Sequence, residues 1–235
     1  MHLFYAPELK NNTHQLSEEE SRHCIKVLRL KKGDPIHLTD GRGVLYRARI
    51  VDEDLRRCRV EIVDHQREYG KRPFYLHLAI APPKNMKRFE WFLEKATEIG
   101  VDEITPLHCF HSERQHIKIQ RMNRVLIAAM KQSLKAYLPL LNEMIPFNEF
   151  IQHSPHPANR YIAYLDEQQS VSLSKIYPPG EDALILIGPE GDFSEEEVEQ
   201  ARASGFQPVK LGASRLRTET AGIAACHSVN LLNGC

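Results

Sequence analysis

Blocks of apolar and polar residues along the chain predict an alternation of strands and helices. The clearest block lies near the C-terminus, where residues 183–187 are all apolar, which is typical of a strand buried on both faces of an α/β sheet. The glycine-containing segment 188–191 ends this run. Ser194 and Glu197 then have the spacing of a capping box, so we expect a helix to begin at Ser194.

The same pattern repeats directly afterwards. Gly205 suits a left-handed helix end, and residues 206–211 are predicted to form the next strand. A second loop follows at residues 212–220. Two loops that follow neighbouring strands form a small-molecule pocket in many α/β proteins, although an ordinary strand–turn–helix with a polar turn has the same pattern.

The composition of the first loop restricts the ligand. Pro189 has no N–H to donate, and Glu190 and Asp192 would repel a pyrophosphate at close range. Phosphate-binding glycine loops need the opposite features. A ligand without phosphates and with some positive charge fits better, for example an adenosine with an amino-acid tail and a sulfonium centre.

The first seventy residues read as a β-rich module with one short helix. Ser17 and Glu20 have capping-box spacing for that helix. We expect the helix to bury Cys24, Ile25, Val27 and Leu28, and we expect strands at 36–39 and 44–51 around a hairpin turn at 40–43. A linker near residues 68–73 marks the boundary of this module.

The remainder of the chain is predicted to be an α/β domain. A strand at 74–81 precedes a helix whose apolar stripe includes Phe89, Phe92 and Ala96 and which Gly100 ends. A second helix is expected from Arg121 to Leu138. Alternating strands and helices favour a mainly parallel sheet with both faces covered.

Composition indicates a cytoplasmic protein without a metal. The 235 residues are 42% hydrophobic, and we find neither a membrane-span pattern nor the apolar core of a signal peptide. The five cysteines include no CxxC pair, which argues against a disulfide framework or a zinc ribbon. His108, Cys109, His111 and His116 are conceivable ligands, but no second ligand set completes a tetrahedron.

Charge is segregated along the chain although its sum is zero. Residues 1–140 contain 25 Lys and Arg against 18 Asp and Glu, a difference of +7; residues 141–235 contain 6 against 13, a difference of −7. Local basic surface, not the total, decides whether a protein contacts phosphates. The first part of the chain therefore qualifies as an RNA-facing region, while simple solvated faces would have the same composition.

The two loops carry a family resemblance. Residues 187–194 (IGPEGDFS), followed by Leu211-Gly212 and by residues 216–221 (LRTETA), resemble the paired motifs of the RsmE family. Further similarity covers His23, residues 27–29, 33–34, 40–41, 91–100 and 104–107, so that nearly the whole chain is included. Members of that family are S-adenosylmethionine-dependent methyltransferases that act on N3 of a uridine in 16S small-subunit ribosomal RNA.

The resemblance implies the architecture. It implies a PUA-like RNA-binding β-barrel over residues 1–72 and a SPOUT methyltransferase domain, an α/β fold with a trefoil knot, over residues 73–235. Periodicity alone would not predict a knot, because knots are rare. It also implies a homodimer, whose contacts would involve the small residues of the terminal helix from Ala221 to Cys226. An intrachain contact is the alternative.

The chain departs from the family pattern at three places. Leu134-Lys135 stands where the family has Gly-Arg, Asp192 stands where a second glycine is common, and Ser214-Arg215 replaces an Arg-Ile pair. Lysine keeps the charge of arginine but loses its planar fork. The resemblance therefore assigns no role to Arg215.

The resemblance implies a cofactor site made of three loops that bind S-adenosylmethionine. The corresponding residues are Leu165, Asp166, Glu167, Ile187, Gly188, Pro189, Glu190, Gly191, Leu211, Gly212, Leu216, Arg217, Thr218, Thr220 and Ala221.

The expected catalytic residues are Arg217 and Glu219. Uridine N3 becomes a nucleophile only after it loses its proton, and the negative charge then spreads to the flanking carbonyl oxygens. A guanidinium aimed at one of these oxygens would stabilise the anion, and we expect Arg217 to do so. Glu219 either accepts the proton or orients Arg217, and we prefer orientation.

Basic and polar residues in both domains are the candidate RNA contacts. They are Arg22, Lys26, Arg29, Lys84, Lys87, Arg88, Gln132 and Lys135, with small-subunit ribosomal RNA or the assembled small subunit as the partner. Two other functions remain open: a SPOUT methyltransferase that modifies another RNA atom, such as a ribose 2′-hydroxyl, and a non-catalytic RNA-binding protein with the same fold.

Overall fold

The chain folds into two units, and the first unit includes a segment from the middle of the chain. The structure is a computed structural model, and it describes residues 1–9, 11–153, 157–164 and 171–235. One unit contains residues 1–71 and 130–138, and the other contains residues 72–129 and 139–235. The sequence division placed residues 130–138 in the second domain, whereas their contacts are with the first.

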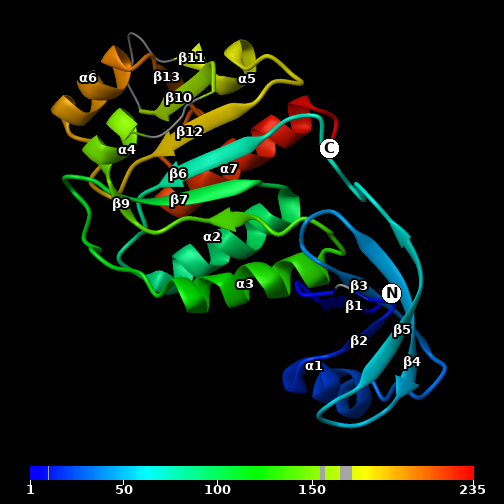
Figure 1. Cartoon of the computed structure of the whole chain (residues 1–235). Coiled ribbons are helices and arrows are strands. Elements are labelled where there is room, and N and C mark those ends of the chain that lie inside the picture. Colours follow the sequence, from blue (N-terminus) through cyan, green and yellow to red (C-terminus); the bar gives the residue numbers. More distant parts are fainter. Residues whose placement is uncertain (10, 154–156, 165–170) are drawn as a thin grey trace. The chain divides into compact units, whose positions relative to one another are not determined.

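The first unit is built on a five-stranded sheet (Figure 1). Its strands are β1 (Leu3–Tyr5), β2 (Thr13–Gln15), β3 (Pro35–Thr39), β4 (Leu45–Asp52) and β5 (Arg59–Gln66), in the order β1-β3-β4-β5-β2. β1 pairs with β3 in parallel, and the other pairs are antiparallel. The predicted hairpin between β3 and β4 is confirmed. Leu38, Ala48 and Val60 are fully buried or nearly so within one core.

A short helix begins where the capping pattern predicts. Helix α1 (Glu18–Arg22) is capped by Ser17, whose Oγ accepts the N–H of Glu20 at 3.2 Å. A five-residue π-helix, η1 (His23–Val27), follows it. Cys24 is buried as expected, but Val27 is 64% exposed. The prediction for Val27 was wrong because a π turn holds more residues than an α turn and so shifts the buried face.

Residues 130–138 contact the first sheet through specific groups. The hydroxyl of Thr39 donates a hydrogen bond to the carbonyl of Ala136 at 3.1 Å. The ring of Tyr137 covers Gly43, where a Cβ atom would lie 2.2 Å from the ring's Cζ. Lys131 Nζ lies 2.7 Å from Glu20 Oε1. This segment is therefore integral to the first unit.

The second unit contains a parallel sheet, as predicted. Its strands are β6 (Leu76–Ile80), β7 (Glu103–His108), β8 (Leu140–Leu141), β9 (Ile145–Pro146), β10 (Asn159–Ala163), β11 (Val171–Ser172), β12 (Ala183–Ile187) and β13 (Gln207–Lys210). The order is β11-β13-β10-β12-β6-β7-β8, with β9 beside β7, and every pair is parallel. All five residues of β6 and of β12 are buried.

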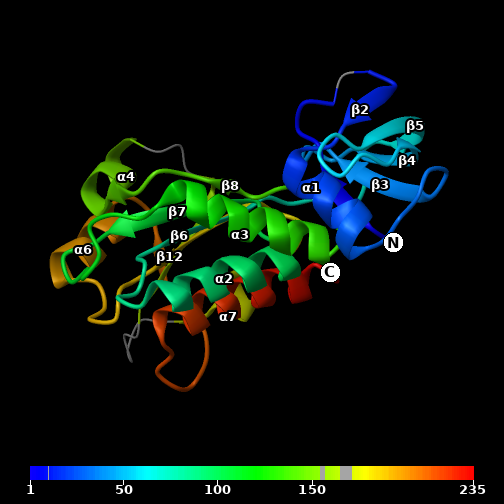
Figure 2. The same ribbon diagram turned by 90° about the horizontal axis from the view of Figure 1, so that it is seen from below.

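Helices cover both faces of this sheet (Figures 1 and 2). They are α2 (Met86–Ile99), α3 (Ile119–Gln132), α4 (Phe147–His153), α5 (Leu173–Ile176), α6 (Glu195–Ala203) and α7 (Thr218–Leu232). Ala79 and Leu186 pack in one core with side chains of α4 and α6. Ile80, the next residue in β6, lies near α7, because neighbouring residues of a strand point to opposite faces.

The end of α2 agrees with the prediction, whereas α7 begins at Thr218, inside the loop predicted to reach residue 220, and α3 ends early. Asn85 caps α2, and Gly100 ends it with φ of 136°. The helix predicted to reach Leu138 instead ends at Gln132. Leu134 has φ of 57°, a left-handed conformation that an α-helix cannot continue through. The resembling family has glycine at this position, and glycine adopts that conformation without strain.

Helices α2 and α7 lie side by side below the sheet in Figure 2. Gly222 permits this approach, since a Cβ there would lie 2.6 Å from Phe92 Cε2. Ala225 and Cys226 are also fully buried. The small residues of α7 at these positions therefore serve an intrachain contact, the alternative to the dimer contact that the resemblance implied for them.

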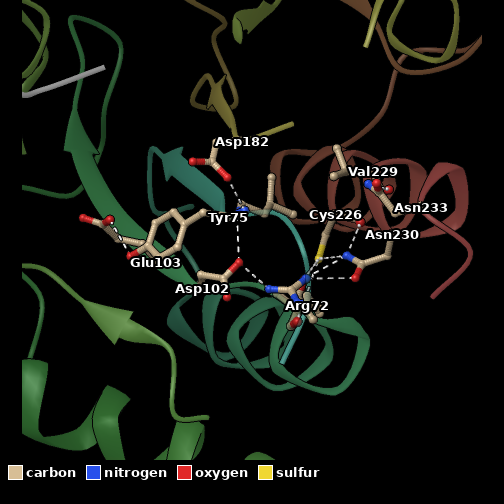
Figure 3. Close-up of polar contacts among 12 residues, drawn as sticks. Arg72, Tyr75, Asp102, Glu103, Asp182, Cys226, Val229, Asn230 and Asn233 are labelled. Carbon is tan, nitrogen blue, oxygen red and sulfur yellow. Dashed lines mark hydrogen bonds and ion pairs between the residues drawn. The ribbon is translucent and has the colours of Figure 1, made fainter. Parts of the chain in front are cut away.

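A polar cluster joins β6, α2 and α7 at the start of the second unit (Figure 3). The guanidinium of Arg72 donates to the carbonyl of Gly100 at 2.6 Å and to Asn230 Oδ1 at 2.9 Å, and it pairs with Asp102. Asn230 in turn donates to the Gly100 carbonyl at 2.8 Å. Buried polar groups are stable only when they are hydrogen-bonded, and here one arginine satisfies groups from three elements.

The knot implied by the resemblance stays a prediction. Within the described residues, no helix is both long enough and apolar enough to cross a membrane.

Candidate functional site

The predicted loops meet because their strands end at the same edge of the sheet. The last residues of three neighbouring strands are aligned in register: Ala163 of β10, Ile187 of β12 and Ile80 of β6. Val209, near the end of β13, pairs with Ala163. The segments after these strands therefore converge, at the position where open parallel sheets bind ligands.

A cavity of about 400 Å³ lies at this edge, a size in the range of small-molecule sites. It is lined by Arg88, Ala163, Tyr164, Ile187, Gly188, Pro189, Glu190, Asp192, Val209, Lys210, Leu211, Gly212, Ser214, Arg215, Leu216, Arg217, Thr218 and Ala221.

The first loop, residues 188–192, has a fixed shape. The N–H of Asp192 donates to the carbonyl of Pro189 at 3.0 Å, which closes a turn. Gly188 packs against Phe193, where a Cβ would lie 3.1 Å from the ring. The carboxylate of Glu190 accepts the N–H of Lys84 at 3.2 Å. The carboxylate of Glu190 is thus held by the backbone of the segment after β6.

The second loop leads into helix α7, whose first turn closes the cavity. Arg217 occupies the N-cap position of α7, and its side chain is exposed. Thr218, the next residue, is buried, and its hydroxyl donates to the carbonyl of Gly188 at 3.0 Å. This hydrogen bond holds the N-terminus of α7 against the first loop, and a helix N-terminus favours negative charge nearby.

Glu219 is paired with Arg88. Its Oε1 lies 3.7 Å from Arg88 Nε, and its side chain is only 8% exposed. Its other oxygen, Oε2, is buried and makes no hydrogen bond within the part of the chain that the structure describes. The expected orientation of Arg217 by Glu219 does not correspond to this geometry, because the ion pair of Glu219 is with α2.

Asp192 has an unusual backbone and electrostatic environment. Its φ of 66° lies in the left-handed region, where the family pattern has glycine. Burial raises the pKa of its carboxyl group, while the hydrogen bond from the N–H of Phe193 and the charge of Arg215 oppose the rise. Asp192 and Arg215 are two departures from the family pattern, and both line the cavity.

The cavity as a whole is more basic than its first loop. The described lining residues include the cations Arg88, Lys210, Arg215 and Arg217 and the anions Glu190 and Asp192. The first loop by itself is acidic, whereas the complete cavity has more cations than anions among its described lining residues. Cations beside a ligand pocket are suited to the phosphates of a nucleic acid.

Most predicted cofactor residues come together in the cavity. Ile187, Gly188, Pro189, Glu190, Leu211, Gly212, Leu216, Arg217, Thr218 and Ala221 line it, whereas Gly191 and Thr220 do not. Gly191 packs against His111, where a Cβ would lie 2.9 Å from the histidine Cβ. Leu165, Asp166 and Glu167 lie outside the described residues.

Sequence reasoning missed several lining residues. Ala163 and Tyr164 directly precede the predicted cofactor residues 165–167, so the end of their strand was the available signal. Arg88 was predicted to contact RNA, and nothing in the sequence indicated its pairing with Glu219. Lys210 and Ser214 gave no signal beyond their place next to predicted residues.

The candidate RNA contacts are divided between the two units. Arg22, Lys26, Arg29, Gln132 and Lys135 belong to the first unit, and Lys84, Lys87 and Arg88 belong to the second. Arg22 Nη2 pairs with Glu18 Oε1 at 2.8 Å, with both side chains more than half exposed. Arg88 lines the cavity.

No group of three or more histidine, cysteine, aspartate or glutamate residues among the described residues is arranged to hold a metal ion.

Family models match both parts of the chain. Residues 70–230 match the RNA methyltransferase domain, and residues 16–63 match the RNA methyltransferase PUA domain. The first match alone covers more than half of the chain.

Known proteins with similar sequences and structures agree with these matches. A probable rRNA-methyltransferase from Porphyromonas gingivalis is 46% identical, with a TM-score of 0.93 over 100% of this chain and 99% of that one. The ribosomal RNA small subunit methyltransferase E of Neisseria gonorrhoeae, solved with bound S-adenosyl methionine, is 30% identical, with a TM-score of 0.89 over 99% and 98%. The curated protein of that name from Synechocystis sp. is 29% identical over 98% of this chain and 77% of its own length.

Proposed function

Because the chain belongs to the ribosomal RNA small subunit methyltransferase E family, we propose that it methylates N3 of a uridine in 16S small-subunit ribosomal RNA. S-adenosylmethionine supplies the methyl group when it is bound. The observation that carries this proposal is the cavity at the carboxyl edge of the parallel sheet, lined by both glycine loops and by Arg217.

The residues present suit this cofactor. The cavity joins an apolar wall, which includes Ile187, Val209 and Leu211, to backbone groups of the glycine loops, and this combination is typical of sites for flat, partly polar ligands. Thr218 stabilises the relative position of the two loops. We assign adenosine and methionine binding to these loops.

Arg217 and the N-terminus of α7 would act on the base. Transfer of the N3 proton to solvent water leaves a uridine anion, and both a guanidinium and a helix N-terminus stabilise negative charge. Arg217 is exposed at that terminus and lines the cavity, so its guanidinium is available to a base that enters from solvent. Glu219 is buried beside Arg88, and we assign it to positioning Arg88.

We assign RNA docking to the first unit together with the basic residues near the cavity. Lys26 and Arg29 are exposed on the segment after α1, and Gln132 is exposed on the segment that packs with that unit. Since the proposed substrate is ribosomal RNA, we infer that the protein acts in the cytoplasm.

A homodimer is the proposed assembly. Gly222 and Ala225 are used within the chain, but other residues of α7 remain accessible, and Leu231 is 63% exposed. A single exposed apolar side chain is common on protein surfaces, so this proposal rests on the family resemblance. Light scattering of the purified protein at several concentrations tests this proposal, and a monomer at all concentrations would contradict it.

Two measurements test the function. Calorimetry should detect S-adenosylmethionine binding with a free energy of roughly −8 kcal/mol, and the absence of binding would contradict any methyl transfer from this donor. Nucleoside analysis of RNA treated with a labelled methyl donor should then yield 3-methyluridine. A 2′-O-methyl product would support the alternative SPOUT reaction instead.

The form of the substrate is decided in the same assay. Naked ribosomal RNA and assembled small subunits, both prepared from cells without the modification, are compared as methyl acceptors. A protein that binds RNA but neither binds S-adenosylmethionine nor transfers its methyl group would be a non-catalytic member of the fold.

A further inference from the structure

Phe110 is the most exposed large apolar side chain described in the second unit. It follows β7, and 78% of its surface is accessible. An exposed phenyl ring does not gain the free energy that burial of its apolar surface would give. Single exposed apolar residues are common, so its significance depends on how it is held and on what surrounds it.

The turn that carries Phe110 is held rigidly. The N–H of Cys109 donates to Ser112 Oγ at 2.9 Å, and the N–H of Ser112 donates to the Cys109 carbonyl at 3.0 Å. The N–H of Phe110 itself donates to Glu197 Oε1 at 2.8 Å, and Glu197 is only 8% exposed. The backbone of Phe110 is thus anchored to α6 while its ring points away from the core.

The same turn packs on the first loop of the cofactor cavity. His111 Nδ1 lies 3.1 Å from the carbonyl oxygen of Asp192, and His111 covers Gly191. The rings of Phe110 and His111 meet edge to face, with centroids 5.0 Å apart and an interplanar angle of 77°. Asp192 lines the cavity. Phe110 therefore directly precedes His111, the residue that contacts this part of the cavity wall.

Cationic side chains lie on the segment that carries Phe110 and on the segment after β6 that this segment contacts. Arg114 binds the carbonyl of Lys84 through Nε at 3.0 Å and Nη2 at 2.8 Å. Lys84 Nζ is 3.4 Å from Glu113 Oε2, so these two charges compensate. Arg114 and Lys87 form no ion pair with the described residues, and their charges remain available to an anionic partner.

From this arrangement we infer that Phe110 is a stacking platform for a base of the RNA strand, next to the uridine that enters the cavity. An aromatic face beside cations is how proteins bind single-stranded RNA, since the ring stacks on a base and the cations contact phosphates. Arg114 and Lys87 would contact the adjacent backbone. This inference rests on the proposed function, and it adds a contact to the same site.

Binding of a labelled single-stranded oligouridylate tests the platform directly. Phe110→Ala should weaken that binding about 10-fold, the loss of one stacked base. Phe110→Trp should restore it, because tryptophan also stacks, whereas Phe110→Leu should remain as weak as Phe110→Ala. Leu140→Ala is the matched control, since Leu140 is 54% exposed on β8, and it should bind like the unchanged protein.

The affinity for S-adenosylmethionine should be unchanged in all four variants, which shows that each is folded. In the methyl-transfer assay, Phe110→Ala should raise KM for RNA and leave kcat nearly unchanged. Lys87→Ala should reduce the slope of the logarithm of the RNA-binding constant against the logarithm of the salt concentration by about one.

The outcomes separate this inference from the proposed function. Unchanged oligouridylate binding and unchanged KM in Phe110→Ala would overturn the platform even if methyl transfer occurs. Full rescue by Phe110→Leu would also overturn it, because it would indicate an apolar protein partner. Stacking-dependent binding without methyl transfer by the unchanged protein would support the platform while the proposed function fails.

Discussion

The hydroxyl of Thr218 donates a hydrogen bond to the carbonyl of Gly188 across 30 residues of sequence, at 3.0 Å. Thr218 begins α7, and Gly188 follows β12 directly. The bond therefore joins the two loops on which the candidate cofactor site depends. Both groups are buried, and a folded state in which a buried carbonyl has no hydrogen-bond donor is less stable.

Thr218→Val should weaken both the fold and cofactor binding. Valine keeps the shape but leaves the Gly188 carbonyl without its donor, so we expect the free energy of unfolding to fall by about 1–2 kcal/mol. Calorimetry should show weaker S-adenosylmethionine binding. Thr220→Val is the control, since Thr220 lies on the same turn and is exposed. Equal effects of the two substitutions would contradict the role of the bond.

Arg217→Ala should abolish methyl transfer selectively. Loss of the cation that faces the uridine anion should lower kcat by at least about 100-fold. S-adenosylmethionine affinity should change by less than about threefold, because the side chain is exposed at the cavity rim. Arg217→Lys should recover part of the rate, since it keeps the charge without the planar fork. An unchanged turnover in Arg217→Ala would exclude this residue from the mechanism.

Arg88→Ala should destabilise the protein through Glu219. The substitution leaves a buried carboxylate unpaired, and we expect the free energy of unfolding to fall by about 1–3 kcal/mol. Adding Glu219→Gln should recover part of this loss, because the unpaired charge is removed. Arg59→Ala breaks an ion pair in which both side chains are largely exposed, and it should cost less than about 1 kcal/mol. No recovery in the double variant would contradict the pairing.

Asp192→Asn should change how stability depends on pH. Burial raises the pKa of Asp192 in the folded chain, so the folded state keeps the proton to higher pH than the unfolded state. The stability linked to this group is fully present below the unfolded pKa of about 3.9 and is lost as the pH rises through the folded pKa. Asp192→Asn should therefore be more stable than the unchanged protein at neutral pH, and this advantage should shrink in acid.

Chemical unfolding at several pH values measures the effect of Asp192→Asn. Asp54→Asn is the opposite control, because backbone hydrogen bonds from Arg56 and Arg57 lower the pKa of Asp54. Asp54→Asn should lose stability at neutral pH and lose little in acid. The same pH dependence in both variants would contradict the assignment.

Glycine at position 134 should relieve backbone strain. Leu134 has a left-handed backbone conformation, with φ of 57°, which is unfavourable for a residue with a side chain. Its side chain is only 36% exposed, so truncation also loses buried apolar surface. Leu134→Ala loses nearly the same burial but keeps the strain, so we expect Leu134→Gly to exceed Leu134→Ala by about 1 kcal/mol in the free energy of unfolding. Equal stability of these two variants would contradict the explanation.

Local chemistry explains why many elements were predictable. The capping box of Ser194 and Glu197 is complete in the structure, with hydrogen bonds in both directions. Gly205 has φ of 82° after α6, as expected. These features depend on residues only a few positions apart, and neighbouring side chains determine them.

The same local reasoning failed where the backbone conformation is unusual for the residue. Leucine at position 134 gave no signal of a helix end, and the π turn at residues 23–27 had no pattern that separates it from an α turn. Asp192 is a further example, since its left-handed φ is typical of glycine. Only comparison with the family pattern marked positions 134 and 192 as exceptions.

The sequence by itself determined the alternation of strands and helices, the parallel sheet and, through its two loop motifs, the family. Tertiary structure alone decided that residues 130–138 join the first unit, that Glu219 pairs with Arg88, and that His111, next to Phe110, contacts the first loop of the cavity. The physical reason is distance along the chain. Capping and burial patterns act between neighbours, whereas these contacts depend on which strands pair, and β6 and β12 pair across about one hundred residues.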